Sequence, residues 1–288
     1  MSKIILITGS STGFGRQTAE ILVKEGNTVY ASMRDPAGRN RENADALRAL
    51  GAKVVELDVT DNASTDGAVA AIIEAEGRLD VLVNNAGSAS VGVSEAFTPE
   101  QASALFDVNV FGLQRVTRAV LPTFRAQNDG LIINIGSILG RVTFPFFGLY
   151  GASKFAVEAL TDSYRLELSQ LGVDVALIQP SAYPTDMYAN VTQPEDTARS
   201  DAYGETGKIP EAMFGSFMEM FAADDAPKPF DVAVAIAKLV NTAKGQRAAR
   251  TVVGNSFGAD TLNDAAAPVQ AGVVEALGLG HLATLKAA

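Results

Sequence analysis

Residues 3–15, KIILITGSSTGFG, join a short apolar run to a turn rich in glycine. The run carries no charge beyond its first residue, which is typical of a strand buried on both faces of a parallel sheet. Gly9, Gly13 and Gly15 then precede a helical pattern that ends at Gly26. A strand, a glycine turn and a helix in this order let the backbone approach a phosphate at the helix N-terminus. The stretch therefore predicts an α/β fold with a phosphate site near its start.

The rest of the chain repeats the alternation of short apolar runs with helical patterns. We expect a doubly wound parallel sheet of the Rossmann type in a single domain spanning residues 1–288. Helical patterns run from 15 to 26, from 99 toward 127, and from 150 to just before 172. The expected strands are 3–8, 28–33, 53–58, 81–84, 131–135, 174–179 and, as a weaker seventh, 251–253.

Composition narrows the classes of function. The 288 residues are 47% apolar, which is enough for a large core. Cysteine is absent and His281 is the single histidine, so we expect neither a metal site nor thiol or Ser/His/Asp catalysis. The net charge of -10 argues against a nucleic-acid partner. Since no apolar run approaches a membrane span of about 18 residues, and residues 4–7 are too short for a signal peptide, we expect a cytoplasmic protein without a membrane partner.

Two segments extend the repeating pattern. Residues 186–226, which we call the lid segment, follow the sixth strand, whose carboxyl end borders the expected ligand crevice. We expect a mobile substrate lid in preference to a helix packed permanently on the core. Residues 246–288 form a C-terminal extension, in which Pro268 is expected to begin an apolar helix that reaches Leu277. The lid segment carries a cluster of large apolar side chains: Phe214, Phe217, Met218, Met220 and Phe221.

Tyr150 and Lys154 lie four residues apart and so share one face of the third helical pattern. An ammonium near a phenol favours the phenolate, which lowers the tyrosine pKa from about 10. Such a tyrosine can donate a proton to a carbonyl oxygen and take it back. Ser137 follows the fifth strand, where its hydroxyl would bind the substrate oxygen. Asn109 lies within the second helical pattern although Asn is a poor helix former, so its place there needs another explanation.

The order and spacing of these motifs resemble the short-chain dehydrogenase/reductase family over residues 3–245. The resemblance rests on the glycine turn, the Asn-Asn-Ala-Gly segment 84–87, Asn109, Ser137 and the Tyr150/Lys154 pair. It implies interconversion of a ketone or aldehyde and an alcohol by hydride transfer, with Asn109, Ser137, Tyr150 and Lys154 as the catalytic residues. By the same resemblance, Asn109 joins a water relay to Lys154, and the protein is a homodimer or homotetramer.

The resemblance also implies a set of cofactor contacts. The turn reads G-x-x-x-G-x-G, which differs from the G-x-G-x-x-G fingerprint. Asp58 and Val59 fall where the family contacts adenine, and segment 84–87 borders the adenosine ribose. Residues 180–185, PSAYPT, match the family's nicotinamide segment except for Ser181 and Tyr183. The expected contacts are Gly9, Ser11, Gly13, Phe14, Gly15, Arg34, Asp58, Val59, Asn84, Ala86, Gly87, Tyr150, Lys154, Pro180, Tyr183 and Thr185.

The end of the second strand distinguishes the two nicotinamide cofactors. A carboxylate there would bind a ribose 2′-hydroxyl, but the matching position is Met33, followed by Arg34. Since a guanidinium suits a 2′-phosphate, we expect NADP(H) in preference to NAD(H). Ser32 and Arg39 are further candidate phosphate contacts. The competing interpretation is that Arg34 pairs with Asp35 on the surface.

Substrate and alternative functions follow from the remaining residues. Arg141 is the one candidate for binding a substrate carboxylate. Aromatic side chains predict an apolar pocket for a bulky or aryl ketone, an aldehyde or a hydroxysteroid-like alcohol. A non-catalytic NAD(P)-binding redox sensor is the alternative, and intact Ser137, Tyr150 and Lys154 argue against it. A nucleotide-sugar epimerase would show another glycine spacing and a larger C-terminal domain. Besides the lid cluster, the pocket candidates are Phe144, Pro145, Phe146, Phe147, Leu149, Tyr183, Met187 and Tyr188.

Overall fold

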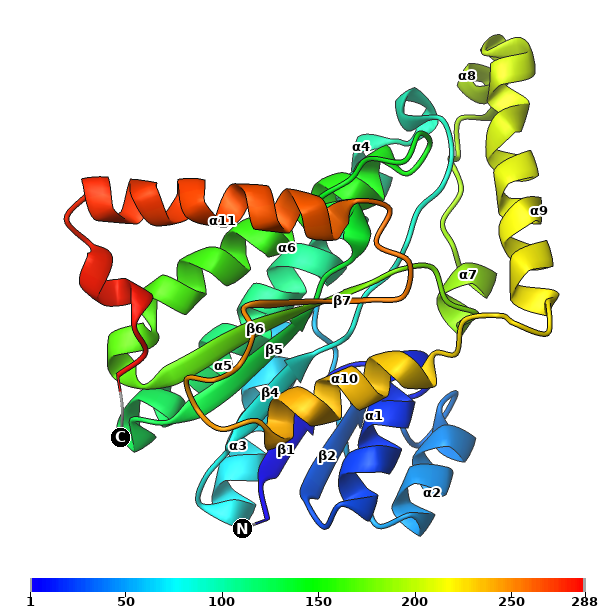
Figure 1. The fold of residues 1–288 in the computed structure, drawn as a ribbon. Coiled ribbons are helices and arrows are strands. Elements are labelled where there is room, and N and C mark those ends of the chain that lie inside the picture. Colours follow the sequence, from blue (N-terminus) through cyan, green and yellow to red (C-terminus); the bar gives the residue numbers. More distant parts are fainter. Residues whose placement is uncertain (1, 287–288) are drawn as a thin grey trace.

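One seven-stranded parallel sheet forms the centre of the computed structural model, in which residues 2–286 are described (Figure 1). The strand order is β3-β2-β1-β4-β5-β6-β7. The chain therefore winds outward in both directions from β1 and β4, which confirms the doubly wound α/β fold. The strands are β1 (Ile4–Ile7), β2 (Thr28–Met33), β3 (Lys53–Glu56), β4 (Val81–Asn84), β5 (Gly130–Ile135), β6 (Val173–Pro180) and β7 (Arg250–Val253).

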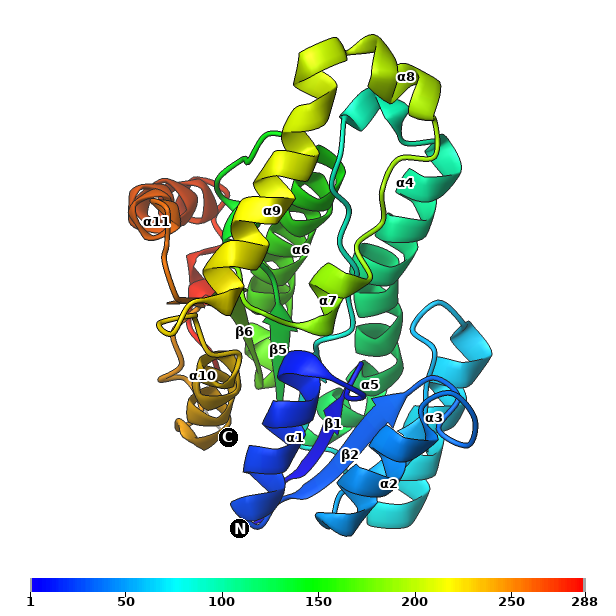
Figure 2. The ribbon, with the colours of Figure 1, turned by 90° about the vertical axis from the view of Figure 1, so that its right-hand side faces the viewer.

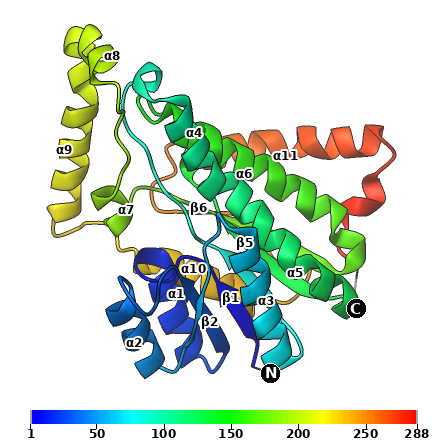
Figure 3. The same cartoon turned by 180° about the vertical axis from the view of Figure 1, so that it is seen from behind.

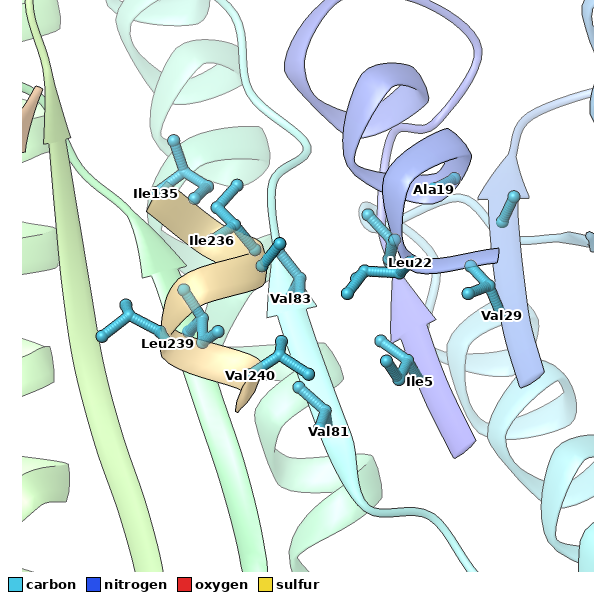
Figure 4. Packing of buried hydrophobic residues seen from close by; sticks show 14 of the residues in the cluster. Ile5, Ala19, Leu22, Val29, Val81, Val83, Ile135, Ile236, Leu239 and Val240 are labelled. Atoms are coloured by element: carbon cyan, nitrogen blue, oxygen red, sulfur yellow. The ribbon is translucent and has the colours of Figure 1, made fainter. Parts of the chain in front are cut away.

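Helices cover both faces of the sheet, and β1 shows how the sequence divides between them. Ile5 and Ile7 pack with one set of helices, whereas the alternate residues Ile4 and Leu6 pack with the other. The first set is α1 (Gly13–Lys24), α2 (Arg41–Ala49) and α10 (Phe230–Asn241). Figure 4 shows buried side chains of α1 and α10 against the strands. The second set is α3 (Asn62–Glu76), α5 (Leu113–Gln127) and α6 (Gly148–Glu167).

The helical pattern that begins at Pro99 is interrupted in the middle. α4 (Pro99–Phe106) starts with a capping box between Thr98 and Gln101. It continues through a π-helical turn, Asp107–Gly112, into α5. Such turns insert one extra residue into a helix and are frequent at functional sites.

The lid segment forms three helices at one end of the molecule, where α9 projects from the body (Figures 1 and 2). They are α7 (Asp186–Ala189), α8 (Thr197–Ala202) and α9 (Ile209–Ala222). None of the three contains a fully buried residue. Figure 3 shows the same arrangement from behind. The segment therefore contributes little to the core, and its role as a substrate lid stays a prediction.

The C-terminal helix differs from the prediction. α11 (Ala259–Ala276) begins nine residues before the expected start, so Pro268 lies inside it. Proline there cannot donate to the carbonyl of Asp264, but that turn of the helix is exposed and water can bind the free carbonyl. The start is set by Gly258, whose φ of +87° turns the chain into the helix. No helix within residues 2–286 is long and apolar enough to cross a membrane.

A substitution at Phe124 tests the packing of α3, α5 and α6 on the sheet. Its side chain is fully buried between α5 and the sheet, so Phe124→Ala leaves a cavity and should lower the free energy of unfolding by about 3–5 kcal/mol. Phe230→Ala, at a position that is 50% exposed, is the matched control and should cost below about 1 kcal/mol. Urea denaturation measures both, and equal losses would contradict the assigned core.

Candidate active site

A cavity of about 820 Å³ lies along the carboxyl edge of the sheet. Residues at or just after the ends of all seven strands line it, as expected for a doubly wound sheet whose order reverses between β1 and β4. The cavity brings together most of the site residues predicted from the sequence. These are Gly9, Ser11, Gly13, Phe14, Arg34, Asp58, Val59, Ala86, Gly87, Ser137, Tyr150, Lys154, Pro180, Tyr183 and Thr185.

Three predicted site residues do not line the cavity. Asn84 is buried within β4 and donates to Thr117 Oγ1 at 3.0 Å and to Asn134 Oδ1 at 2.9 Å. Asn84 was expected to contact the cofactor, but its side chain instead links β4 to β5 and α5. Gly15 lies beneath the turn, where a Cβ would meet Asn85 Nδ2 and come within 2.5 Å of the Gly9 carbonyl oxygen. Asn109 lies behind the cavity wall and is 2% exposed.

Asn85 also lines the cavity, although the sequence did not single it out as a site residue. Its Nδ2 donates to the carbonyl oxygens of Thr8 at 2.8 Å and Gly9 at 2.9 Å. In return, Thr8 Oγ1 accepts from the backbone amides of Asn85 and Ala86, both at 3.0 Å. These bonds fix the glycine turn against the end of β4. The motif match placed Asn85 at the right point, but its side-chain direction followed only from the structure.

The glycine turn has the properties of an anion cradle. Gly9 and Gly13 have φ angles of +65° and +56°, which favour glycine. A Cβ on Gly9 would lie 2.9 Å from Ala86 Cα. The N-cap residue of α1, Thr12, makes no side-chain cap, and the first turn contains no acidic residue. The first amides of α1 are thus free to bind a phosphate, as the sequence predicts.

Two arginines line the end of the cavity that lies next to the carboxyl end of β2. Arg34 and Arg39 are exposed and line it together with Met33. The Asp35 carboxylate accepts from the Arg39 backbone amide at 2.9 Å, and within residues 2–286 neither guanidinium forms an ion pair. The surface pair of Arg34 with Asp35 is therefore not seen. Ser32 is fully buried and lies outside the cavity, so its expected phosphate contact is corrected.

The positive charges of Arg34 and Arg39 also affect the pKa of Asp58. Burial opposes ionisation of its carboxyl group, whereas hydrogen bonds from the Thr60 amide and hydroxyl favour it. Arg34 and Arg39 add to the effect, so that the pKa of Asp58 is lowered from its ordinary value. The region is therefore electropositive and keeps an ionised carboxylate beside it.

The Tyr150/Lys154 pair lies on the first turns of α6, facing the cavity. Lys154 Nζ is 5.7 Å from the centre of the Tyr150 ring. It donates to the Ile135 carbonyl oxygen at the end of β5, at 2.9 Å. Ser137, two residues further, accepts from the Leu139 amide at 3.1 Å. One strand end thus holds both the lysine and the serine next to the phenol.

The pKa of Tyr150 differs from the one predicted from the sequence. Burial raises the pKa of Tyr150 to about 12, although the nearby Ser137 hydroxyl favours the phenolate. Burial also lowers the pKa of Lys154 to about 8. The predicted lowering of the Tyr150 pKa is therefore not found in the protein alone, and the effect of Lys154 on a cofactor-bound site stays a prediction. The Lys154 ammonium donates to the Ile135 carbonyl oxygen, and burial of the Tyr150 phenol is the largest influence on the tyrosine pKa.

Asn109 explains the interruption of the α4–α5 helix. In the π-helical turn its Oδ1 accepts from the Ser88 amide at 2.8 Å, and its Nδ2 donates to the Ser88 carbonyl oxygen at 2.9 Å. The same Nδ2 donates to Ser153 Oγ at 3.0 Å, and Ser153 in turn donates to the Tyr150 carbonyl oxygen at 2.7 Å. Asn109 thus ties the segment after β4 to the helix that carries Tyr150.

An aromatic wall closes the other half of the cavity. Phe147 and Phe217 meet edge to face with ring centres 6.1 Å apart. Tyr183 also lines the cavity but is not part of this wall. Its ring centre lies 5.6 Å from that of Phe14, and its side chain packs against Gly254. Pro145, Phe146, Leu149, Met218 and Phe221, also expected in the pocket, do not line it. The wall contains Phe144, Phe147, Met187, Tyr188, Phe214, Phe217 and Met220, with Phe257 from the C-terminal extension.

Arg141 is not available to a substrate carboxylate. Its Nη2 lies 3.1 Å from Glu158 Oε2, which also accepts from Arg250 Nε at 2.8 Å. Gln179 Nε2 donates to the other oxygen of Glu158 at 2.5 Å, and Asn263 on α11 donates to Gln179 at 2.7 Å. This buried network joins α6 to the C-terminal extension, so Arg141 has a structural partner instead of a ligand.

The chain is similar to known proteins over most of its length. A family model described as short chain dehydrogenase matches residues 3–196. The 3-ketodihydrosphingosine reductase of Bacteroides thetaiotaomicron is 40% identical over 204 residues, which are 71% of this chain and 72% of that protein.

Two solved structures have the same architecture. A short-chain dehydrogenase from Streptomyces avermitilis superposes with a TM-score of 0.77 at 29% identity, covering 97% of this chain and 98% of its own. Actinorhodin polyketide ketoreductase with NADPH superposes with a TM-score of 0.74 at 28% identity, covering 89% and 97%.

Lys154 gives a prediction for stability. Its pKa is about 8 in the folded protein against an ordinary value of 10.5, so between these values the unfolded chain binds more protons and stability rises with pH. Below about pH 8 Lys154 is charged in the folded protein, so the cost of burying its ammonium lowers the free energy of unfolding in full. Lys154→Met should therefore raise the free energy of unfolding by about 2 kcal/mol at pH 7, and by less at about pH 9.5.

Urea denaturation at the two pH values measures this gain. Lys24→Met, at an exposed position on α1, is the control and should change stability little at either pH. A gain that is absent, or that does not shrink as the pH rises, would show that Lys154 is not held in a desolvated site.

Proposed function

The chain belongs to the short-chain dehydrogenase family, and we propose that it interconverts a ketone or aldehyde and an alcohol with NADP(H). One observation carries the proposal: Tyr150, Ser137 and Lys154 meet at the end of β5, in the same cavity as an uncapped helix N-terminus. A proton donor and an anion cradle in one cavity are the two parts that carbonyl reduction by a dinucleotide requires.

The residues present fit a nicotinamide dinucleotide. The turn Gly9 to Gly13 and the first amides of α1 would hold its pyrophosphate. Arg34 and Arg39, which have no carboxylate partner within residues 2–286, would bind a 2′-phosphate. Asp58 and Val59 would border the adenine, and Thr185 the nicotinamide end. The NADPH in the similar polyketide ketoreductase supports a nicotinamide dinucleotide at this site, and the choice of NADP(H) rests on the two arginines.

The protein's own residues would manage the proton. When bound, the cofactor supplies or accepts the hydride. Ser137 Oγ would donate a hydrogen bond to the substrate oxygen and stabilise the charge that develops there. Tyr150 would donate its proton to that oxygen in reduction, and its phenolate would accept the proton in oxidation. Because the pKa of Lys154 is about 8, its ammonium could restore the phenol proton near neutral pH.

The cavity favours a substrate with a large apolar part. Phe144, Phe147, Phe214 and Phe217 surround the space beyond Tyr150. Within residues 2–286, the Arg141 guanidinium is held by Glu158 and does not line the cavity. A bulky or long-chain ketone therefore fits better than a small acid, in keeping with the substrate that gives the similar 3-ketodihydrosphingosine reductase its name. We further propose that the lid segment covers this substrate, and that the protein is a homodimer or homotetramer.

Tyr150→Phe tests the proposed acid. The variant keeps the ring but lacks the proton, so kcat for ketone reduction should fall by at least about 10³-fold. The Kd for NADPH, followed by nucleotide fluorescence, should stay within about threefold. Tyr164→Phe on the same helix, outside the cavity, should leave kcat unchanged. Undiminished turnover in the Tyr150 variant would remove this residue from the mechanism.

Arg34→Ala tests the cofactor preference. Loss of the guanidinium should raise the Kd for NADPH by about tenfold and alter the Kd for NADH by less than about twofold. Arg48→Ala on α2 removes a paired, exposed guanidinium and serves as the control for net charge. Isothermal titration of each variant with both nucleotides gives the four constants, and equal weakening of NADPH and NADH would undo the assignment.

A further inference from the structure

Arg141 ends the short turn that carries Ser137. The Ser137 hydroxyl accepts from the Leu139 amide at 3.1 Å, at the start of a single turn of 3₁₀ helix. The Arg141 amide closes this turn by donating to the Ile138 carbonyl oxygen at 2.9 Å. Residues 137–141, which we call the serine turn, therefore form one compact unit with a hydroxyl at its start and a guanidinium at its end.

The serine turn packs directly on α6, the helix of the proposed acid. A Cβ on Gly140 would lie 2.9 Å from Glu158 Cγ and 3.0 Å from the Lys154 carbonyl oxygen. Nearer the start of α6, a Cβ on Gly151 would lie 3.5 Å from the Leu139 carbonyl oxygen. Because backbone meets helix at both places, any shift of the turn on α6 would move the serine relative to the proposed acid.

An ion pair between Arg141 and Glu158 holds the far end of the serine turn on α6. Arg141 Nη2 lies 3.1 Å from Glu158 Oε2, and Glu158 is 3% exposed, so little water screens the attraction. The buried Arg141 Nε has no hydrogen-bond partner among residues 2–286, so this ion pair orients the guanidinium. Glu158 follows Tyr150 and Lys154 at intervals of four residues, on neighbouring turns of α6.

Arg250 on β7 provides an internal comparison. Its Nε donates to the same Glu158 oxygen at 2.8 Å, and its Nη2 donates to Asp162 Oδ2 at 2.5 Å. The side chains of Arg141 and Arg250 are 20% and 18% exposed. Two guanidinium groups thus share one carboxylate in similar surroundings, but only Arg141 belongs to the serine turn.

On the basis of the proposed function, in which Ser137 binds the reacting oxygen, we propose that Arg141 is a positioning residue. Its ion pair with Glu158 fixes the serine turn on α6 and so keeps the Ser137 hydroxyl in place beside the Tyr150 phenol. Both hydroxyls must reach the same substrate oxygen, and a displacement of about 1 Å at such a site can lower the rate about 100-fold. Arg141 therefore acts on the reaction through Ser137, without touching the substrate.

Arg141→Met and Arg250→Met test the proposal in the full-length protein. Each variant removes one guanidinium from Glu158, so the melting temperature should fall in both. The kcat for reduction of a long-chain ketone with NADPH should fall by about 10- to 100-fold in Arg141→Met. It should stay within about threefold of wild type in Arg250→Met. Arg141→Lys, which keeps a cation within reach of Glu158, should recover most of the lost kcat.

A second measurement separates positioning from a loss of stability. In a Ser137→Ala background the hydroxyl that Arg141 positions is absent, so Arg141→Met should lower the residual kcat by less than about threefold. If Arg141→Met does not fold, Arg141→Gln replaces it in both comparisons, because its amide can still donate to Glu158.

Three outcomes would overturn the proposal while leaving the proposed reaction intact. They are a wild-type kcat in the folded Arg141 variant, an equal fall in kcat in Arg250→Met, and a fall in the Ser137→Ala background as large as that with Ser137 present. If wild type reduces no member of a wide ketone panel, the proposed reaction itself fails, and the positioning role fails with it.

Discussion

Hydrogen bonds between the ends of β1 and β4 hold the site together. Thr8 Oγ1 accepts from two amides after β4, while the Asn85 side chain donates to two carbonyl oxygens of the glycine turn. This exchange fixes the glycine turn, where we propose that the pyrophosphate binds, against the segment that leads to Gly87. A Cβ on Gly87 would lie 3.4 Å from Asn109 Oδ1 and 3.9 Å from Lys154 Nζ. One continuous set of contacts therefore positions both the glycine turn and the Tyr150/Lys154 pair.

The electrostatics of the cavity divide along its length. The end near β2 is exposed and positive because Arg34 and Arg39 have no acidic partner within the described part of the chain. The middle is buried, and there desolvation keeps Tyr150 protonated and weakens the hold of Lys154 on its proton. A phenol that keeps its proton and an amine that releases one readily suit delivery of a proton to a substrate. These opposite shifts follow from burial, so they depend on the aromatic wall as well as on the pair itself.

Sequence reasoning recovered the architecture and most of the cavity, because buried parallel strands appear as short apolar runs and each run is followed by its site residues. It failed where the direction of a side chain decided the role. Asn84 and Asn85 are identical in type and adjacent, yet one faces the core and the other the glycine turn. The direction of the Tyr150 pKa shift could not be predicted, because the burial that raises this pKa comes from segments far apart in the sequence. Pro268 suggested a helix start, but an exposed helix tolerates a missing amide.

The separation of the lid segment from the core affects how this protein can diversify. The family match ends at residue 196, inside that segment, and α9 beyond it contains no fully buried residue. Substitutions in α9 would reshape the aromatic wall while the sheet and the glycine turn keep their packing. The shape of this wall can therefore vary at little cost to the stability of the sheet.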